Sequence, residues 1–288
     1  MHKAGLLILF FVCAFGQISA QEKKNIIFIT APNQHAKGEH EYKAGCHLLA
    51  KLISENIPGV FTRVYDNGWP SDSSVFDNAA SIVLYCNGGE RHLLLSHLEE
   101  MNRLMNKGVG LVALHNAVEA TKGKVETYLL RWLGGYFETW YSVNPRWKAF
   151  ITHFPVHEIT NGVKPFALKD EWYYHLRFTD SQQNITGIVQ TVPPISSLQE
   201  GDSPYKGNDM VRKAIVNKEQ QTLMWTYERA DSGRSVGFTG GHFYINWRNN
   251  DFRKLVLNAI AWSAKIRIPA EGIYSDRPSR GEFKRLKD

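Results

Sequence analysis

The stretch Gly108-Val-Gly-Leu-Val-Ala-Leu-His115-Asn-Ala-Val-Glu119 decides the fold of this chain. Four apolar residues, Leu111 to Leu114, lie between a glycine turn and the polar pair His115 and Asn116. This pattern is typical of a buried parallel strand that emerges at its carboxyl edge, where open α/β sheets bind their ligands. The sequence therefore predicts a strand here, with a functional side chain at its end.

Strand-like and helix-like runs alternate on both sides of this stretch. Short apolar or β-branched runs predict further strands at residues 25–30, 60–65, 80–85, 185–189, 223–228 and 234–238. Apolar repeats of helical period predict helices after Glu41, at residues 94–105, at 125–133 and from about Asp251. The order predicts an α/β fold with a doubly wound, mostly parallel, flavodoxin-like sheet in three α/β/α layers.

The two ends of the chain differ from this pattern. Residues 1–20 carry one lysine, a short apolar core and small residues ending at Ala20, which predicts a secretory signal peptide too short to span a membrane. Residues 275–288 are basic, bear a proline and have few apolar side chains, which predicts a mobile or surface-laid tail. We therefore expect one domain over residues 21–274, in an exported protein of the periplasm or the extracellular space.

Composition excludes some classes of protein. The formal net charge of +6 is spread along the chain apart from the tail, so it does not indicate a nucleic-acid surface. Cys46 and Cys86 each lie in an apolar segment and form neither a disulfide framework nor a metal motif. We expect both to be buried free thiols, although a single disulfide bond is the alternative in an oxidising compartment.

Polar side chains follow several predicted strands. His40 and Glu41 come after the first, His115 and Asn116 after the strand of the opening stretch, and His242 after a late strand in Thr239-Gly-Gly-His242. Carboxyl ends of parallel strands share one edge, so we expect these groups to converge, with Glu171 joining them from the aromatic region. His115, Glu171 and His242 are the predicted catalytic residues and the candidate ligands of a divalent metal.

The role of His115 remains open at this stage. Its imidazole can shuttle protons, bind a metal or donate a hydrogen bond to a substrate, or it can simply cap the backbone. No Cys-x-x-Cys motif is present, and the one His-x-x-x-His spacing is that of His153 and His157. His153 and His157 have helical spacing, but Pro155 between them predicts surface or turn histidines instead.

Aromatic residues make up 12% of the chain, including eight tryptophans, and they gather in residues 128–178 and 224–247. Such clusters form cores, but aromatic faces also pack against the C–H faces of sugar rings. From Tyr136 the sequence becomes aromatic and proline-bearing, which indicates loops and short strands at the sheet edge. The predicted ligand is a small-molecule sugar, and its predicted contacts are His40, Glu41, Asn116, Tyr173, Arg177 and Trp247.

Seven separate segments resemble the ThuA family, the trehalose-utilisation proteins, whose fold is similar to class I glutamine amidotransferases. The matching segments are His40-Glu-Tyr-Lys-Ala-Gly45, Gly110-Leu-Val-Ala-Leu-His115, Leu133-Gly-Gly-Tyr136, Ile159-Thr-Asn-Gly-Val-Lys-Pro-Phe166, Asp170-Glu-Trp-Tyr-Tyr174, and Trp225-Thr-Tyr-Glu-Arg229 followed by Gly237-Phe-Thr-Gly-Gly-His242. The elbow cysteine of the amidotransferases is replaced by His115, so glutamine hydrolysis is not expected.

The resemblance implies a role in disaccharide or glucoside breakdown, beside oxidoreductases that make 3-keto sugars. A 3-keto group acidifies the neighbouring C–H bonds, so a positioned base could start elimination, isomerisation or glycosidic cleavage. The expected protein is an exported carbohydrate-active lyase, isomerase or hydrolase of a keto-glycoside. A non-catalytic sugar-binding protein and a metal-dependent hydrolase of another substrate class are the alternatives.

Overall fold

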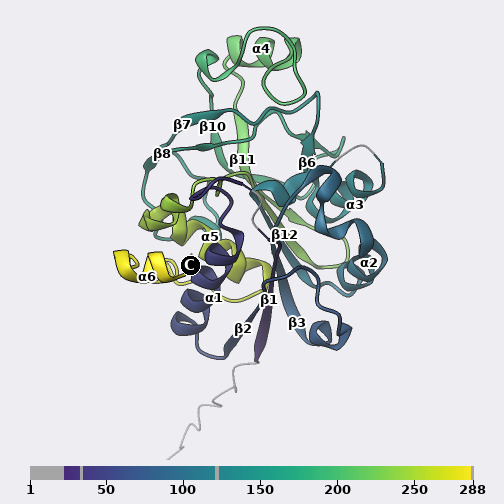
Figure 1. The fold of residues 1–288 in the computed structure, drawn as a ribbon, viewed down its shortest axis with the longest axis vertical. Helices are drawn as coiled ribbons and strands as arrows, with labels where there is room; N and C mark the ends of the chain where they lie inside the picture. The colour runs from purple at the N-terminus through teal and green to yellow at the C-terminus, as the bar shows by residue number, and fades with distance from the viewer. Residues whose placement is uncertain (1–22, 33–34, 121–122, 287–288) are drawn as a thin grey trace, which may run out of the picture.

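A seven-stranded sheet forms the centre of the molecule (Figure 1). The computed structural model describes residues 23–32, 35–120 and 123–286. The strand order is β10-β11-β12-β4-β3-β1-β2. All neighbours are parallel except β11, which is antiparallel to β10 and to β12. The strands are β1 (Lys24–Thr30), β2 (Val60–Tyr65), β3 (Ala79–Tyr85), β4 (Gly110–Leu114), β10 (Ile185–Thr191), β11 (Gln221–Glu228) and β12 (Arg234–Phe238).

The opening stretch of the sequence forms the strand near the middle of this sheet. All five residues of β4 are buried, because helices cover both faces of the sheet. The predicted strands are therefore confirmed, within two residues at each end. The doubly wound, mostly parallel α/β arrangement is confirmed as well.

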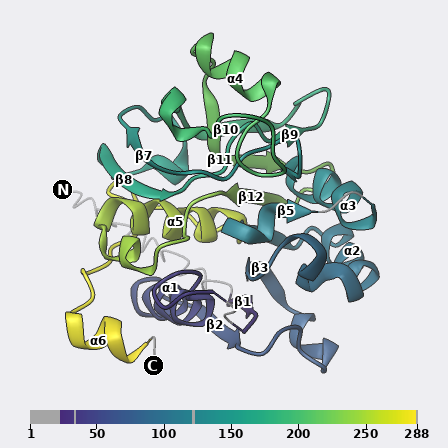
Figure 2. The ribbon, with the colours of Figure 1, turned by 45° about the horizontal axis from the view of Figure 1, so that its top comes forward.

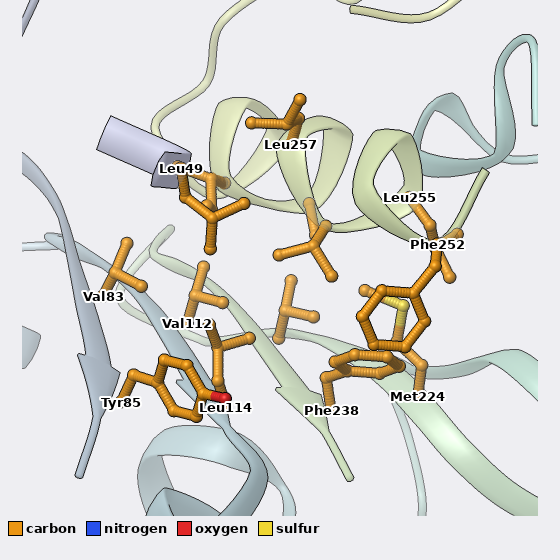
Figure 3. Packing of buried hydrophobic residues seen from close by; sticks show 14 of the residues in the cluster. Leu49, Val83, Tyr85, Val112, Leu114, Met224, Phe238, Phe252, Leu255 and Leu257 are labelled. Carbon is orange, nitrogen blue, oxygen red and sulfur yellow. The ribbon is translucent and has the colours of Figure 1, made fainter. Parts of the chain in front are cut away.

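Two helices cover each face of the sheet (Figures 1 and 2). Helices α1 (Tyr42–Asn56) and α5 (Asn250–Ser263) pack on one face, and α2 (Leu98–Asn106) and α3 (Lys124–Leu133) on the other. In Figure 3, apolar side chains of α5 lie over those of the central strands; it labels Leu49, Val83, Tyr85, Val112, Leu114, Met224, Phe238, Phe252, Leu255 and Leu257. The two apolar layers give the predicted three-layer architecture.

The segment between α3 and β11 is built from short strands and one helix. β5 (Glu119–Ala120), β6 (Gly135–Glu138) and β9 (Arg177–Phe178) form one small sheet, and β7 (Arg146–Ile151) pairs with β8 (Phe166–Glu171) in another. Helix α4 (Asp209–Val216), at the top of Figure 1, was not predicted. It is short, begins at the Asn208 side-chain cap and buries only three residues, too few to give a clear helical period.

Near the C-terminus, part of the basic tail forms helix α6 (Arg280–Arg285). The Ser279 hydroxyl caps it, and the Phe283 ring stacks on Tyr244 with 4.0 Å between centroids. The predicted signal peptide lies outside the described residues. Within the described part of the chain, the helices are too short or too polar to cross a bilayer.

Cys46 and Cys86 are both buried free thiols, as predicted. Burial raises the pKa of Cys86 to about 12 and that of Cys46 well above its usual range. Both therefore stay protonated at neutral pH, and they act as small apolar core residues.

Substitution of Gly110 by alanine tests how closely α5 packs on the sheet. A Cβ there would lie 2.2 Å from the carbonyl oxygen of Ser263, a backbone atom that cannot move without shifting the helix end. We expect Gly110→Ala to lower the free energy of unfolding by about 3 kcal/mol in urea denaturation. The control is Gly281→Ala in α6, where a Cβ has room and should change stability by less than about 0.5 kcal/mol. Equal effects of the two substitutions would contradict this packing.

Candidate metal centre

A cavity of about 910 Å³ opens at the carboxyl edge of the parallel strands. Its wall includes Asn87 after β3, Asn116 after β4 and His242 after β12. The segment between α3 and β11 supplies the opposite wall, through residues such as Tyr141 and Arg177. The position is the one that doubly wound sheets offer to ligands.

His115 follows β4 directly, in a left-handed backbone conformation that residues other than glycine rarely adopt. Its φ is 52°, and its side chain is fully buried. The Nδ1 atom lies 2.7 Å from the carbonyl oxygen of Thr239. Since a carbonyl can only accept, Nδ1 carries the proton, and Nε2 lies 3.3 Å from His40 Nε2, behind the cavity wall.

His40 has a similar arrangement at the start of α1. Its φ is 50°, and its backbone N–H donates to the carbonyl oxygen of His242 at 2.8 Å. Its Nδ1 lies 2.8 Å from the Tyr42 hydroxyl, which itself donates to Asn87 at 3.2 Å. The Asn116 amide nitrogen also lies 3.3 Å from this Nδ1, and His40 Nε2 faces His242 Nδ1 at 2.5 Å.

Asp170 fixes the loop that carries His242. Its buried carboxylate accepts hydrogen bonds from the backbone N–H groups of Gly241 at 2.8 Å, Phe243 at 3.2 Å and Glu171 at 2.9 Å. The flanking peptides of His242 and the backbone of Glu171 are thus held by one side chain. Gly241 has a φ of 115°, which only glycine adopts readily.

Four donor atoms converge on one point: His40 Nε2, His115 Nε2, His242 Nδ1 and Glu171 Oε2. The His40 nitrogen lies 2.5 Å from that of His242 and 3.3 Å from that of His115. The Glu171 oxygen lies 3.6 Å from His115 and 3.3 Å from His242, and the cluster fits within 4.8 Å. Ligands bound at roughly 2.05 Å in a tetrahedral zinc site are about 3.3 Å apart. The separations of 3.3, 3.6 and 3.3 Å match this spacing, whereas the 2.5 Å between His40 and His242 would widen when a divalent transition metal binds.

An outer set of charged groups supports the cluster. Glu39 Oε2 lies 3.4 Å from His242 Nε2, and its other oxygen pairs with Arg146 at 3.0 Å. The Arg146 Nε also lies 3.9 Å from Glu171 Oε1, the oxygen that points away from the histidines. A carboxylate behind a ligating histidine is a common way to orient its ring and increase its basicity.

The protonation states also suit metal ligands. Burial raises the pKa of Glu171, but the neighbouring imidazoles of His115 and His242 outweigh it and hold this pKa far below its usual range. Burial, followed by the charges of His115 and His242, holds the pKa of His40 well below its usual range. Glu171 is therefore a carboxylate and His40 a neutral imidazole, the forms in which both bind cations.

Glu119 lines the same cavity. Burial raises the pKa of its carboxyl from 4.5 to about 7, against the opposing effect of His115. Gly88 packs directly on it, since a Cβ on that glycine would lie 2.7 Å from the Glu119 Cβ. A carboxyl group that titrates near neutral pH in a cavity is suited to donate and accept protons.

The raised pKa of Glu119 predicts a pH-dependent stability difference between the wild type and Glu119→Gln. The folded pKa of about 7 exceeds the ordinary 4.5, so folding favours the protonated acid. Relative to the variant, the wild type should lose about 3 kcal/mol of unfolding free energy as the pH rises from 4 to 8. The measurement is urea unfolding in a chelator, because a bound cation would lower this pKa. Arg91, His115 and Glu171 face Glu119, and the same groups remain in the variant. A pH-independent difference would contradict the assignment.

Most of the predicted site residues do line the cavity. His40, Asn116, Glu171, Tyr173, Arg177 and His242 are on its wall. The Tyr173 hydroxyl lies 3.3 Å from His115 Nε2 and donates a short hydrogen bond to Asn116. His40 was predicted as a sugar contact only, but the structure places its Nε2 in the cluster.

Two predicted sugar contacts need correction. Glu41 does not line the cavity, because its carboxylate turns back to accept from the Gly38 N–H at 2.7 Å. Trp247 is fully buried in the core, with its ring 5.0 Å from Phe252 between centroids. His153 is exposed and His157 caps a 3-10 turn, as predicted for surface or turn histidines.

Sequence reasoning did not identify Glu39, Glu119, Trp140 or Asp170 as site residues. Glu119 ends the opening stretch and Asp170 directly precedes Glu171, so both lie beside predicted site residues. Their burial and their partners come from distant parts of the chain. No local signal distinguishes them from other acidic residues.

Comparisons with known proteins agree with this architecture. The sequence profile of the ThuA family, described as trehalose utilisation, matches residues 29–263. A search among curated proteins gave no match. A ThuA-like protein from Bacteroides uniformis superposes with a TM-score of 0.57 at 15% identity, covering 85% of this chain and 93% of that one. Another from Parabacteroides merdae gives 0.54 at 16% identity, with 89% and 94% covered. At these identities the two structures show a shared fold.

Proposed function

Because the chain belongs to the ThuA family of trehalose-utilisation proteins, we propose that it is a divalent-metal-dependent enzyme acting on a keto-glycoside. The observation that carries the proposal is the convergence of three imidazole nitrogens and one carboxylate oxygen within 4.8 Å. Such a donor set suits zinc and neighbouring transition metals. The ligands would be His40, His115, Glu171 and His242.

The short contact between His40 and His242 requires either a shared proton or a cation between the two rings. Two imidazole nitrogens 2.5 Å apart repel each other unless a proton or a metal ion lies between their lone pairs. The Thr239 carbonyl accepts the Nδ1 proton of His115, so the neutral form of this ring directs its Nε2 lone pair toward His40. The negative charge of Glu171 further favours a cation over an empty cluster.

These contacts make the histidines better ligands than bases, so we assign the proton transfer to Glu119. In a 3-keto-glycoside, the C–H bond at C2 is acidified by the adjacent carbonyl. Glu119 takes that proton, the C1–O bond breaks, and a C1=C2 double bond forms. The departing oxygen then takes a proton and leaves as an alcohol. A bound divalent ion would supply Lewis-acid polarisation of the carbonyl oxygen.

Tyr173, Asn116 and His35 would contact the sugar near this point. Tyr173 and Asn116 share a hydrogen bond on the wall of the cavity. His35 packs against His40 with 3.7 Å between ring centroids and an interplanar angle of 33°, and it also lines the cavity. Together they supply donors and acceptors for sugar hydroxyl groups beside the cluster.

The test is incubation of the purified protein with trehalose and with 3-keto-trehalose, followed by mass spectrometry. We expect conversion of the keto sugar alone, lost after chelation and restored by one added divalent metal. Conversion that survives complete removal of metals would contradict the metal role. Binding of the keto sugar without conversion would favour the non-catalytic sugar-binding protein.

Export is a separate part of the proposal and rests on residues 1–20 of the sequence. We propose that this segment directs the protein out of the cytoplasm and is removed after Ala20. N-terminal sequencing of protein recovered from the periplasm or the medium should begin at Gln21. Recovery of full-length protein from the cytoplasm alone would contradict export.

A further inference from the structure

Trp140 is unusual among the eight tryptophans of this chain. Its side chain is 59% exposed, whereas Trp69 is half-buried and the other six are buried. It lines the same cavity as the histidine cluster. An exposed indole leaves a large apolar face in water, which stabilises nothing in the protein itself.

The backbone holds Trp140 in this exposed position. Its φ of 71° lies in the left-handed region, which costs a bulky residue on the order of 1–2 kcal/mol. Its N–H donates to the Pro204 carbonyl oxygen at 2.9 Å, and its own carbonyl accepts from Asn208 at 3.2 Å. The strained conformation is therefore fixed by a neighbouring segment, so the indole is presented in a defined place.

Polar side chains that hydrogen-bond to one another, Arg177 and Glu138, line the same cavity as the Trp140 indole. Arg177 donates to both Glu138 oxygens, at 2.8 and 3.1 Å, and its guanidinium lies 3.5 Å from the Tyr141 ring centroid. The Tyr136 hydroxyl also donates to Glu138 at 2.8 Å. Rigid charged groups near a flat apolar face match a pyranose ring, which has apolar C–H faces and a polar rim of hydroxyl groups.

The dimensions of the cavity allow one ligand to reach both regions. At about 910 Å³ it lies near the upper end of the roughly 300–1,000 Å³ range of small-molecule sites. A single sugar ring at the cluster would leave the Trp140 region empty. We propose that Trp140, Tyr141 and Arg177 form a second sugar subsite that binds the departing ring, so the substrate is a disaccharide. This inference rests on the proposed function.

The experiment compares Trp140→Gly and Trp140→Phe with the wild type. Glycine accepts the positive φ but removes the ring, and phenylalanine keeps an aromatic face. KM and kcat are measured with 3-keto-trehalose and with methyl 3-keto-α-glucoside, which lacks a second ring. Trehalose binding is followed separately by tryptophan fluorescence, which requires no turnover. The control is Phe150→Ala in β7, also 59% exposed but outside this cavity.

We expect Trp140→Gly to raise KM for 3-keto-trehalose about tenfold with kcat unchanged, and to leave KM for the methyl glycoside unchanged. Trp140→Phe should restore most of the loss, and Phe150→Ala should match the wild type. Equal losses with both substrates, or none with the disaccharide, would overturn the subsite while leaving the metal-dependent reaction in place. Wild-type protein that neither binds trehalose nor converts a keto sugar would overturn both proposals.

Discussion

His115→Ala is expected to abolish stoichiometric metal binding and to lower kcat/KM for 3-keto-trehalose on the order of a thousandfold or more. His115 is the ligand whose orientation is fixed most firmly, by the 2.7 Å hydrogen bond from Nδ1 to Thr239. Without its Nε2, two imidazoles and one carboxylate remain. Metal content is measured by mass spectrometry after dialysis, and activity by product formation.

The left-handed backbone at His115 requires a second variant. Alanine at a φ of 52° is strained by about 1 kcal/mol, so His115→Ala could lose metal through local distortion. His115→Gly relieves that strain and still removes the imidazole, and we expect the same loss of metal. His157→Ala, at a half-buried turn histidine, is the matched control and should keep both metal and activity. Metal retained in both His115 variants would exclude the cluster as the binding site.

The same metal should stabilise the folded protein, because the four ligands come together only when the chain is folded. A ligand present at 1,000 times its Kd adds about 4 kcal/mol to the free energy of unfolding. For a domain of this size, that corresponds to a rise in Tm of about 10 °C. We expect the rise in the wild type and in His157→Ala, and its absence in His115→Ala. A rise of equal size in His115→Ala would show that the metal binds elsewhere.

Asp170→Asn is expected to lower the free energy of unfolding by about 3 kcal/mol and to weaken metal binding. The Asp170 carboxylate is fully buried and accepts three backbone hydrogen bonds, on the loop of His242 and at Glu171. An amide of the same shape would direct an NH2 group at one of these N–H donors. The three N–H groups position two of the four proposed ligands, Glu171 and His242, so stability and metal affinity should fall together.

Urea unfolding in a chelator separates these two effects, because it measures stability without the metal. Asp180→Asn provides the control, since that side chain is exposed and should change stability by less than about 0.5 kcal/mol. Metal affinity is then measured by calorimetry on the folded variants. If Asp170→Asn is as stable as the control and binds metal normally, the proposed role of this carboxylate is wrong.

The sequence alone determined the sheet and the strand ends from which His115 and His242 extend. Runs such as Leu111 to Leu114 are apolar throughout because helices cover both faces of the sheet, and this needs no knowledge of distant contacts. The abrupt change to His115 and Asn116 marked where the strand leaves the core. Parallel strands then place their carboxyl ends at one edge, so the approximate position of the site followed as well.

Only the tertiary structure decided which polar and aromatic residues belong to the site. His40 and His242 are 202 positions apart, and their contact depends on how two loops pack. Trp140 and Trp247 both lie in aromatic-rich segments of the sequence, yet Trp140 faces the cavity and Trp247 lies in the core. The pKa of Glu119 likewise depends on burial by other segments. The local pattern of apolar and polar residues indicates whether a segment is buried. The contacts and the solvation of a single side chain depend on segments far away in the chain.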